Sequence, residues 1–362
     1  MGGMGSIVLE LPPTRGNPRN SEGAFLRLRD GRLMFAYSRF TGNSDGDDAP
    51  ACIAARYSSD GGISWSVDDD ILFTRDRFGV KNIMSVSLMR MADGALGIYF
   101  GLRRGWHDTR LHLFRSQDEG RTWSEPVCCI PAKGYYVVNN DRVVRLASGR
   151  ILIPSSFHRM KGESSEDWGS FDGRGAAYFF LSDDNGLTWR EAKQCCALPA
   201  PASATGLQET GVTELGNGVL WAYFRTDMGC QYESFSRDGG ESWTQASPSR
   251  FSGPVSPLSV KRMLDGRLLA VWNPVPLYQT RIRKGWSWGR TPLACAVSGD
   301  DAKSWTAPLL VEDGQDNGGY CYTAIHAEPD GVLLAYCAGN ESDRICLAKL
   351  RMRRIPMREL GS

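Results

Sequence analysis

The chain has 362 residues, of which 41% are hydrophobic and 23% charged, and its formal net charge at pH 7 is +1. This composition can bury a large core and excludes a disordered or strongly basic protein, so we expect no nucleic-acid partner. No apolar run approaches the roughly 20 residues of a membrane-spanning helix, so we expect no membrane partner either.

The first expected element is a short apolar strand at 6–10, just before Pro12 and Pro13. The segment around this strand lacks the basic and then apolar stretches of a signal peptide. The ten cysteines show no CxxC spacing, and most fall in apolar strands, where thiols behave as small buried hydrophobes. We therefore expect free thiols and a cytoplasmic location. The four histidines are not spaced for zinc, so we expect no metal site.

A strand–turn–strand pattern then recurs along the chain. Each copy joins two apolar-alternating runs through Asp, Asn or Ser followed by Gly, and such a dipeptide is the strongest short hairpin signal. Glycine is needed because φ is positive there, and Asp or Asn tolerates the neighbouring position. The six turns begin at Asp30, Asp93, Ser148, Asn217, Asp265 and Asp330. Their spacing suits one four-stranded propeller blade per repeat.

A second motif, Ser-x-Asp-x-Gly-x-Ser/Thr-Trp, follows five of these hairpins. A single copy would be an ordinary polar turn before a buried tryptophan. Five copies at the same place relative to an upstream hairpin indicate a structural repeat. We interpret the motif as a folding device and not as a catalytic one. The copies end at Trp65, Trp123, Trp189, Trp243 and Trp305, and the last has Ala302 in place of the glycine.

These repeats predict an all-β fold, a single six-bladed β-propeller over residues 1–362 with four-stranded antiparallel blades. The last repeat ends at a third strand, 344–350, with no motif behind it. Because a circular array cannot leave that edge open, we expect strand 6–10 to close the ring as the outer strand of the last blade. The basic segment 351–360 is then interpreted as a solvated tail. The blades are expected at about 21–75, 83–130, 137–195, 207–248, 255–311 and 320–350.

The repeat also predicts which residues converge at the centre. Antiparallel strands alternate in direction, so the starts of all first strands share one face with the long loops, where function usually lies. An apolar strand does not normally start with a carboxylate or a tyrosine, so these positions form a candidate site. Counting back eight residues from each turn reaches Glu22, Ser85, Asn140, Glu209, Pro257 and Tyr322.

The repeated octets are Asp-boxes, and with them the chain resembles the sialidase (neuraminidase) superfamily of six-bladed β-propellers over nearly its whole length. The resemblance implies an exo-acting glycoside hydrolase that retains anomeric configuration, uses a tyrosine nucleophile and needs no cofactor. The expected partner is a small saccharide or glycoconjugate. A terminal acidic sugar is the expected leaving unit, with sialic acid as the first choice.

The resemblance also implies roles for three residues. GYCYTAI resembles the nucleophile segment of the family, which makes Tyr322 the nucleophile. QETGVTELGNGVLWAYFR resembles the Glu-to-Arg block of the family, which makes Glu209 the base for the tyrosine and Arg225 a clamp for the substrate carboxylate. A base is needed because a phenol with a pKa near 10 is a weak nucleophile at neutral pH.

Two further roles leave alternatives open. GRTPLACAVS resembles the strand that carries the last clamp arginine, which implies Arg290, with Arg281 and Arg283 as rivals. Asp47 occupies the place of the acid/base carboxylate. Because loop spacing is loose, Asp45 or Asp48 could substitute for it.

The chain departs from the family at the first clamp arginine, where Glu22 lies close to the expected position. Three guanidinium groups hold a carboxylate by charge-assisted bonds, so this exchange should weaken sialate binding unless Arg19 or Arg142 reaches into the site. Ser85 and Asn140, at the equivalent central positions, are further expected contacts to the substrate.

Two rival functions follow from this departure. The first keeps the enzyme but changes the substrate to another uronic or keto-acid glycoside, with Glu22 recognising a hydroxyl. The second is a carbohydrate-binding propeller without turnover, because fold does not fix function. The pairing of Glu209 with Tyr322 argues against the second, since a lectin has no use for an activated phenol. Loop residues that could line a sugar pocket are Trp106, His107, His158, Trp286 and Trp288.

Overall fold

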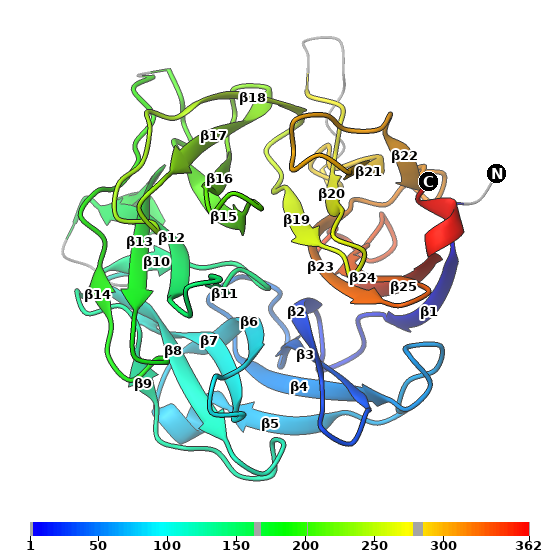
Figure 1. The fold of residues 1–362 in the computed structure, drawn as a ribbon. Helices are drawn as coiled ribbons and strands as arrows, with labels where there is room; N and C mark the ends of the chain where they lie inside the picture. Colours follow the sequence, from blue (N-terminus) through cyan, green and yellow to red (C-terminus); the bar gives the residue numbers. More distant parts are fainter. Residues whose placement is uncertain (1–2, 163–167, 201, 278–284, 362) are drawn as a thin grey trace.

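The computed structural model describes residues 3–162, 168–200, 202–277 and 285–361. The fold is all-β, as predicted, and these ranges hold three short 3-10 helices beside the strands: η1 (Arg75–Phe78), η2 (Trp168–Ser170) and η3 (Met357–Glu359). The sheets are arranged around a common centre, with β2, β6, β15, β19 and β23 nearest to it and β5, β9, β14, β18 and β22 at the rim (Figure 1).

Four of the sheets have four antiparallel strands each in the described part of the chain. The first holds β2 (Asn20–Arg27), β3 (Leu33–Phe40), β4 (Ala51–Ser58) and β5 (Asp70–Thr74). Another holds β15 (Gln208–Glu214), β16 (Leu220–Arg225), β17 (Cys230–Ser236) and β18 (Ser247–Ser252). The next holds β19 (Ser259–Arg262), β20 (Leu268–Trp272), β21 (Leu293–Ser298) and β22 (Leu309–Glu312). The last holds β23 (Cys321–Glu328), β24 (Gly331–Cys337), β25 (Leu350–Pro356) and β1 (Ser6–Leu11).

A nine-stranded sheet spans two of the predicted repeats. Its two antiparallel halves meet at a single parallel bridge between Tyr135 and Thr109. One half holds β6 (Asn82–Arg90), β7 (Leu96–Gly105), β8 (Asp108–Ser116) and β9 (Val127–Cys128). The other holds β10 (Tyr135–Val137), β11 (Val144–Arg145), β12 (Ile151–Met160), β13 (Phe171–Ser182) and β14 (Arg190–Glu191).

The core lies between neighbouring sheets. One buried cluster joins Ala24 and Ile53 of the first sheet to Ile83, Phe100 and Phe114 of the next. Because the middle strands are covered on both faces, they bury almost every residue, as in β3 and β24. No helix in the described ranges is long and apolar enough to cross a membrane.

The two ends of the chain meet in one sheet. Strand β1 pairs antiparallel with β25, with Ser6 opposite Arg354 and Leu11 opposite Leu350. The prediction that the N-terminal strand supplies the outer strand of the last sheet is confirmed.

The prediction for the C-terminal segment is wrong. The third strand of the last sheet is Leu350–Pro356 and not 344–350, so Arg351, Arg353 and Arg354 lie within a strand rather than in a solvated tail. Arg351 and Arg353 are buried, and their guanidinium groups contact Glu312 Oε1 at 2.9 Å and 3.0 Å. Hydropathy cannot show this strand, because the partner that neutralises its arginines comes from β22 of the neighbouring sheet.

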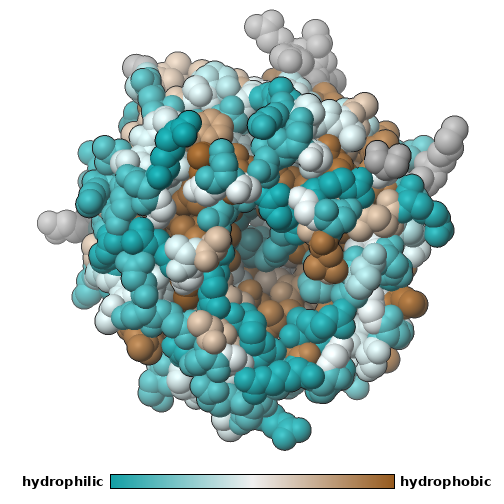
Figure 2. All heavy atoms as spheres, in the orientation of Figure 1, coloured by the Kyte–Doolittle hydropathy of each residue, from teal (hydrophilic) through white to brown (hydrophobic). Residues whose placement is uncertain are grey.

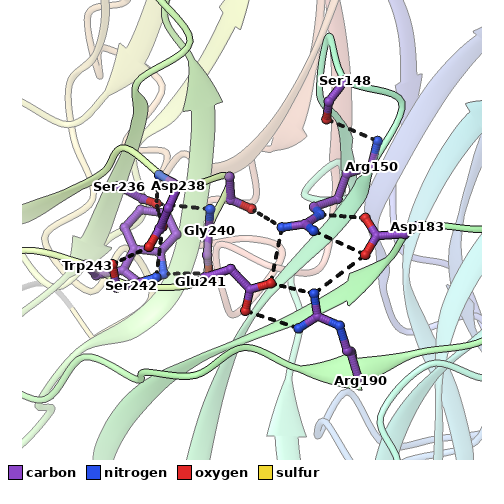
Figure 3. Close-up of polar contacts among 11 residues, drawn as sticks. Ser148, Arg150, Asp183, Arg190, Ser236, Asp238, Gly240, Glu241, Ser242 and Trp243 are labelled. Atoms are coloured by element: carbon purple, nitrogen blue, oxygen red, sulfur yellow. Dashed lines mark hydrogen bonds and ion pairs between the residues drawn. The ribbon is translucent and has the colours of Figure 1, made fainter.

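The Asp-boxes stabilise turns and join neighbouring sheets. In the box between β17 and β18, Asp238 Oδ1 accepts a hydrogen bond from the Ser242 amide at 2.9 Å, and Trp243 Nε1 donates to the Gly240 carbonyl at 3.1 Å (Figure 3). The Trp243 ring stacks on Phe179 of β13, with 4.1 Å between centroids.

Charged side chains strengthen the same junction. Arg150 donates to the carbonyl of Gly239 in the box at 3.0 Å and to Asp183 at 2.6 Å (Figure 3). Arg190 and Arg150 both pair with Glu241. The Asp-box contacts seen here are therefore structural.

We predict that Glu312→Ala destabilises the protein by about 3–5 kcal/mol, because it removes the carboxylate paired with buried Arg353 and one of the three carboxylates that Arg351 contacts. Urea denaturation measures this change. As a control, Asp265→Ala breaks a more exposed pair with Arg267 and should cost about 1 kcal/mol or less. Equal effects of the two substitutions would contradict the prediction.

Candidate active site

A cavity of about 500 Å³ lies where the sheets converge, and Figure 2 shows a hollow at the centre of the molecule. The cavity is lined by strand ends and loops from all parts of the chain. It brings together most of the residues selected from the sequence: Arg19, Glu22, Asp47, Ser85, Glu209, Arg225, Arg290 and Tyr322. Asp45 also lines it.

Four of these residues share an unusual backbone conformation. Glu22, Ser85, Glu209 and Tyr322 have φ values of 50°, 66°, 49° and 58°. At each, the pairing of the innermost strand with its neighbour shifts register, as at a β-bulge. A bulge changes the direction in which a side chain points, and it is common beside active sites. The strain of a positive φ is tolerated where the surrounding structure holds it in place.

Tyr322, Glu209 and Arg225 form a closed triangle of hydrogen bonds. Tyr322 Oη donates to Glu209 Oε1 at 2.8 Å. Arg225 Nη1 donates to the same carboxylate oxygen and also to Tyr322 Oη at 3.3 Å. The phenol thus has an acceptor for its proton and a cation beside its oxygen. This arrangement can turn the phenol into a nucleophile, because the arginine stabilises the negative charge that develops on Oη.

Arg290 also lies beside the tyrosine. Its guanidinium carbon is 5.2 Å from the centre of the Tyr322 ring and 4.8 Å from that of Trp288. Its Nε donates to the Val255 carbonyl at 3.2 Å and its Nη1 to Cys321 Sγ at 3.1 Å. No carboxylate pairs with Arg290 among the described residues, so its charge is available to an anionic ligand. The rivals Arg281 and Arg283 lie outside the described residues.

Arg19 is buried between two carboxylates. Its Nη1 donates to Asp47 Oδ1 at 2.6 Å, its Nη2 lies 3.4 Å from Glu22 Oε1, and its guanidinium lies over the Phe40 ring at 4.4 Å. Arg19 therefore reaches the cavity but is occupied with orienting Asp47 and Glu22. Asp48, an alternative to Asp47, is not part of the cavity wall.

The surroundings in the cavity shift the pKa values of several side chains. Burial and the Glu209 carboxylate raise the pKa of Tyr322 well above its usual value, against Arg290 and Arg225, so the resting phenol keeps its proton. Burial raises the pKa of Glu22 to about 7, and Asp47 and Glu209 add to the effect while Arg19 opposes it. Burial acts in the same sense on Asp47, but Arg19 and Arg103 outweigh it and lower its pKa.

Asn140 and Arg142 do not line the cavity. Asn140 Nδ2 donates to the carbonyls of Gly23 at 2.8 Å and Tyr322 at 3.1 Å, so it joins three sheets behind the site. Arg142 Nη2 donates to the Leu258 carbonyl at 2.7 Å. Neither side chain replaces a clamp arginine. In this repeat the positive φ falls one residue later, at Asp141, which explains why counting back eight residues selected the wrong position.

Sequence reasoning missed one wall of the cavity. Arg103, Asn139, Tyr135 and Phe171 line it, together with His158 and Trp288, which the sequence had offered only as loop residues. Counting forward from the turns does not find Arg103, because it lies ten residues after Asp93, whereas Arg225 lies eight residues after Asn217. Of the other loop candidates, Trp106 packs behind Tyr135, with 4.9 Å between ring centres. The described residues contain no group of three or more His, Cys, Asp or Glu that could hold a metal ion.

Comparison with known proteins assigns the family. Residues 31–334 match the BNR repeat-like domain. The chain belongs to this family, within the sialidase superfamily. A sialidase of Bacteroides fragilis is 25% identical over 63% of this chain and 39% of its own length. The anhydrosialidase of Macrobdella decora is 25% identical over 60% of this chain and 28% of its own length. The matched stretch thus spans less than half the length of either relative.

Solved structures share the fold. The NanB sialidase of Streptococcus pneumoniae superposes with a TM-score of 0.72 at 13% identity, over 99% of this chain and 71% of its own. A leech intramolecular trans-sialidase gives 0.71 at 16% identity, over 98% and 70%. A protein of unknown function from Dyadobacter fermentans gives 0.70 at 16% identity, over 97% and 99%. At these identities the likeness shows the fold alone.

We predict that Glu22→Gln changes how the stability of the protein depends on pH. The pKa of Glu22 is about 7 in the folded protein and usually 4.5, so its contribution to stability is full below about pH 4.5 and is lost as pH rises through 7. Glutamine cannot ionise. The variant should therefore gain stability relative to the wild type as pH rises from about 4.5 to 8, measured by denaturation at a series of pH values. Parallel curves would refute the prediction.

Proposed function

We propose that the protein is an exo-acting, retaining glycoside hydrolase that removes a terminal acidic sugar, with sialic acid as the first choice. We further propose that its sheets form one closed six-bladed propeller domain over residues 1–362. The observation that carries the proposal is the 2.8 Å hydrogen bond from Tyr322 Oη to Glu209 Oε1 inside the central cavity. Both residues lie on positive-φ bulges, as expected of a strained catalytic arrangement.

In the first step, Tyr322 Oη attacks the anomeric carbon and its proton passes to Glu209. Arg225 stabilises the oxygen as it loses the proton, since it donates to both partners. Asp47 gives a proton to the glycosidic oxygen, and the bond to the leaving group breaks. In the second step a water molecule attacks the anomeric carbon and Asp47 takes a proton from it. The bond from that carbon to Tyr322 Oη breaks, and Glu209 returns its proton to Oη.

A neutral nucleophile suits an acidic sugar. A carboxylate on or beside the anomeric carbon would repel an attacking Asp or Glu, whereas a phenol carries no charge before the reaction. Arg290 and Arg225 lie beside the tyrosine, where they can pair with that carboxylate. These contacts support an anionic group held next to the reacting carbon.

A second candidate substrate follows from the contacts of Arg19. Because this arginine is taken up by Asp47 and Glu22, the guanidinium groups that remain beside Tyr322 among the described residues are those of Arg225 and Arg290. Recognition of a substrate hydroxyl by Glu22 would require its side chain to move, because Oε1 is engaged by Arg19 and Oε2 is buried. This arrangement favours another uronic or keto-acid glycoside as the alternative to a sialoside.

The test is hydrolysis of a fluorogenic sialoside and of a panel of uronic-acid and keto-acid glycosides, by wild type and by Tyr322→Phe. We expect the variant to lose activity by about a thousandfold or more, because the covalent step is removed. Tyr57→Phe is the matched control: it removes a tyrosine–carboxylate bond of 2.8 Å, to Asp70, that lies outside the cavity. This control should keep full activity.

The panel separates the hypotheses. Cleavage of the sialoside alone supports the first substrate, and cleavage of other acidic sugars supports the second. Undiminished activity of Tyr322→Phe would rule out the tyrosine as nucleophile. A wild-type protein that binds sugars but cleaves none would instead be a carbohydrate-binding propeller.

A further inference from the structure

His158, from β12, is a buried side chain in the cavity wall for which the proposed chemistry has no use. Only 3% of its surface is exposed, and its ring is among those that line the cavity. Aromatic rings hold it in place: its centre lies 4.9 Å from that of Phe171 and 6.0 Å from that of Tyr135. These ring contacts restrict the orientation of the imidazole.

The tautomer of His158 follows from one contact. Nδ1 lies 3.1 Å from the backbone carbonyl oxygen of Asp172. A carbonyl oxygen can only accept, so Nδ1 must carry the proton. Nε2 is then unprotonated and presents a lone pair on the other edge of the ring.

The ring is also neutral at physiological pH. Burial lowers the pKa of His158 to about 4, and the nearby Arg225 adds to this, against the Asp172 contact and Glu209. The imidazole is therefore an uncharged acceptor at Nε2 and not a cation.

This acceptor has no partner within the described ranges of the chain. Some other acceptors of the cavity are already engaged: Asp47 Oδ1 and Glu22 Oε1 by Arg19, and Glu209 Oε1 by Arg225 and Tyr322. The unpaired side-chain oxygens of Glu22, Glu209, Asn82 and Asn139 in the cavity wall are buried. Nε2 is thus a neutral acceptor without a partner among the described residues, on a ring that lines the cavity.

We propose that His158 is a specificity-determining residue whose Nε2 accepts a hydrogen bond from a hydroxyl or amide N–H of the bound sugar. The inference rests on the proposed function and identifies a group of the substrate that the anion-binding arginines do not recognise. A site built to accept a hydrogen bond discriminates strongly against an analogue without the donor, because the buried acceptor is then left unpaired.

The matched control is His112 in β8. Its Nδ1 lies 3.0 Å from the Arg110 carbonyl, burial lowers its pKa to about 4, and it lies outside the cavity wall. We expect His158→Phe to raise KM for the cleaved sugar about tenfold, with little change in kcat, because a neutral hydrogen bond is lost. His158→Gln, which offers an amide oxygen, should restore most of the affinity. His112→Gln should leave both constants unchanged.

Imidazole nitrogen NMR tests the same contact without turnover, since the chain has only four histidines to assign. Titration with N-acetylneuraminic acid, or with the acidic sugar that the panel selects, should shift the Nε2 signal of His158 and leave that of His112 in place. A matching sugar that carries a hydroxyl in place of the amide identifies the donor. If a sugar hydroxyl donates to Nε2, this analogue still shifts the signal; if the amide N–H donates, the shift is lost.

The outcomes are distinct from those of the proposed function. A shift at His158 with no hydrolysis would support the binding role of His158 and contradict the proposed hydrolase activity. Hydrolysis with no shift at His158 in the sugar-bound protein, or with an unchanged KM in His158→Phe, would overturn the inference. A protein that binds none of the sugars would overturn it as well.

Discussion

The site depends on one backbone constraint, the positive φ at the same place in four innermost strands. Glu22, Ser85, Glu209 and Tyr322 each hold this conformation at a shift in strand pairing. Each costs on the order of 1–3 kcal/mol. The buried clusters, the Asp-boxes and the charged pairs between sheets stabilise the surrounding fold and so offset this cost. The resulting rigidity allows a phenol from β23 and a carboxylate from β15 to lie at 2.8 Å.

Charge pairing then decides what each cavity group can do. Arg19 is held between Asp47 and Glu22, so it positions carboxylates and leaves the substrate to Arg225 and Arg290. Arg225 is shared between Glu209 and Tyr322 and so contributes to both activation and binding. In the proposed mechanism Asp47 must gain a proton that Arg19 disfavours, which favours activity on the acidic side of neutrality. His158 adds an uncharged acceptor to this set.

Much of this arrangement could be predicted because the repeat places a glycine turn at a constant distance from the bulge. That distance selected Glu22, Ser85, Glu209 and Tyr322, and the open edge of the last repeat predicted the pairing of β1. It failed where the bulge moved by one residue, at Asp141. It also gave no sign of the buried arginines of β25 or of Arg103, because their partners and the cavity come from other repeats. His158 was expected only as one of several loop residues that could line a sugar pocket.

The central claim is that Tyr322 forms a covalent bond to the sugar, and trapping this bond is its most direct test. The protein would be incubated with a fluorinated acidic sugar of the cleaved type, whose second step is slow, then digested and analysed by mass spectrometry. The account predicts one sugar on the peptide that contains Tyr322, and none in Tyr322→Phe. A sugar attached instead to Glu209, Glu22 or Asp47, or turnover without any covalent adduct, would contradict it.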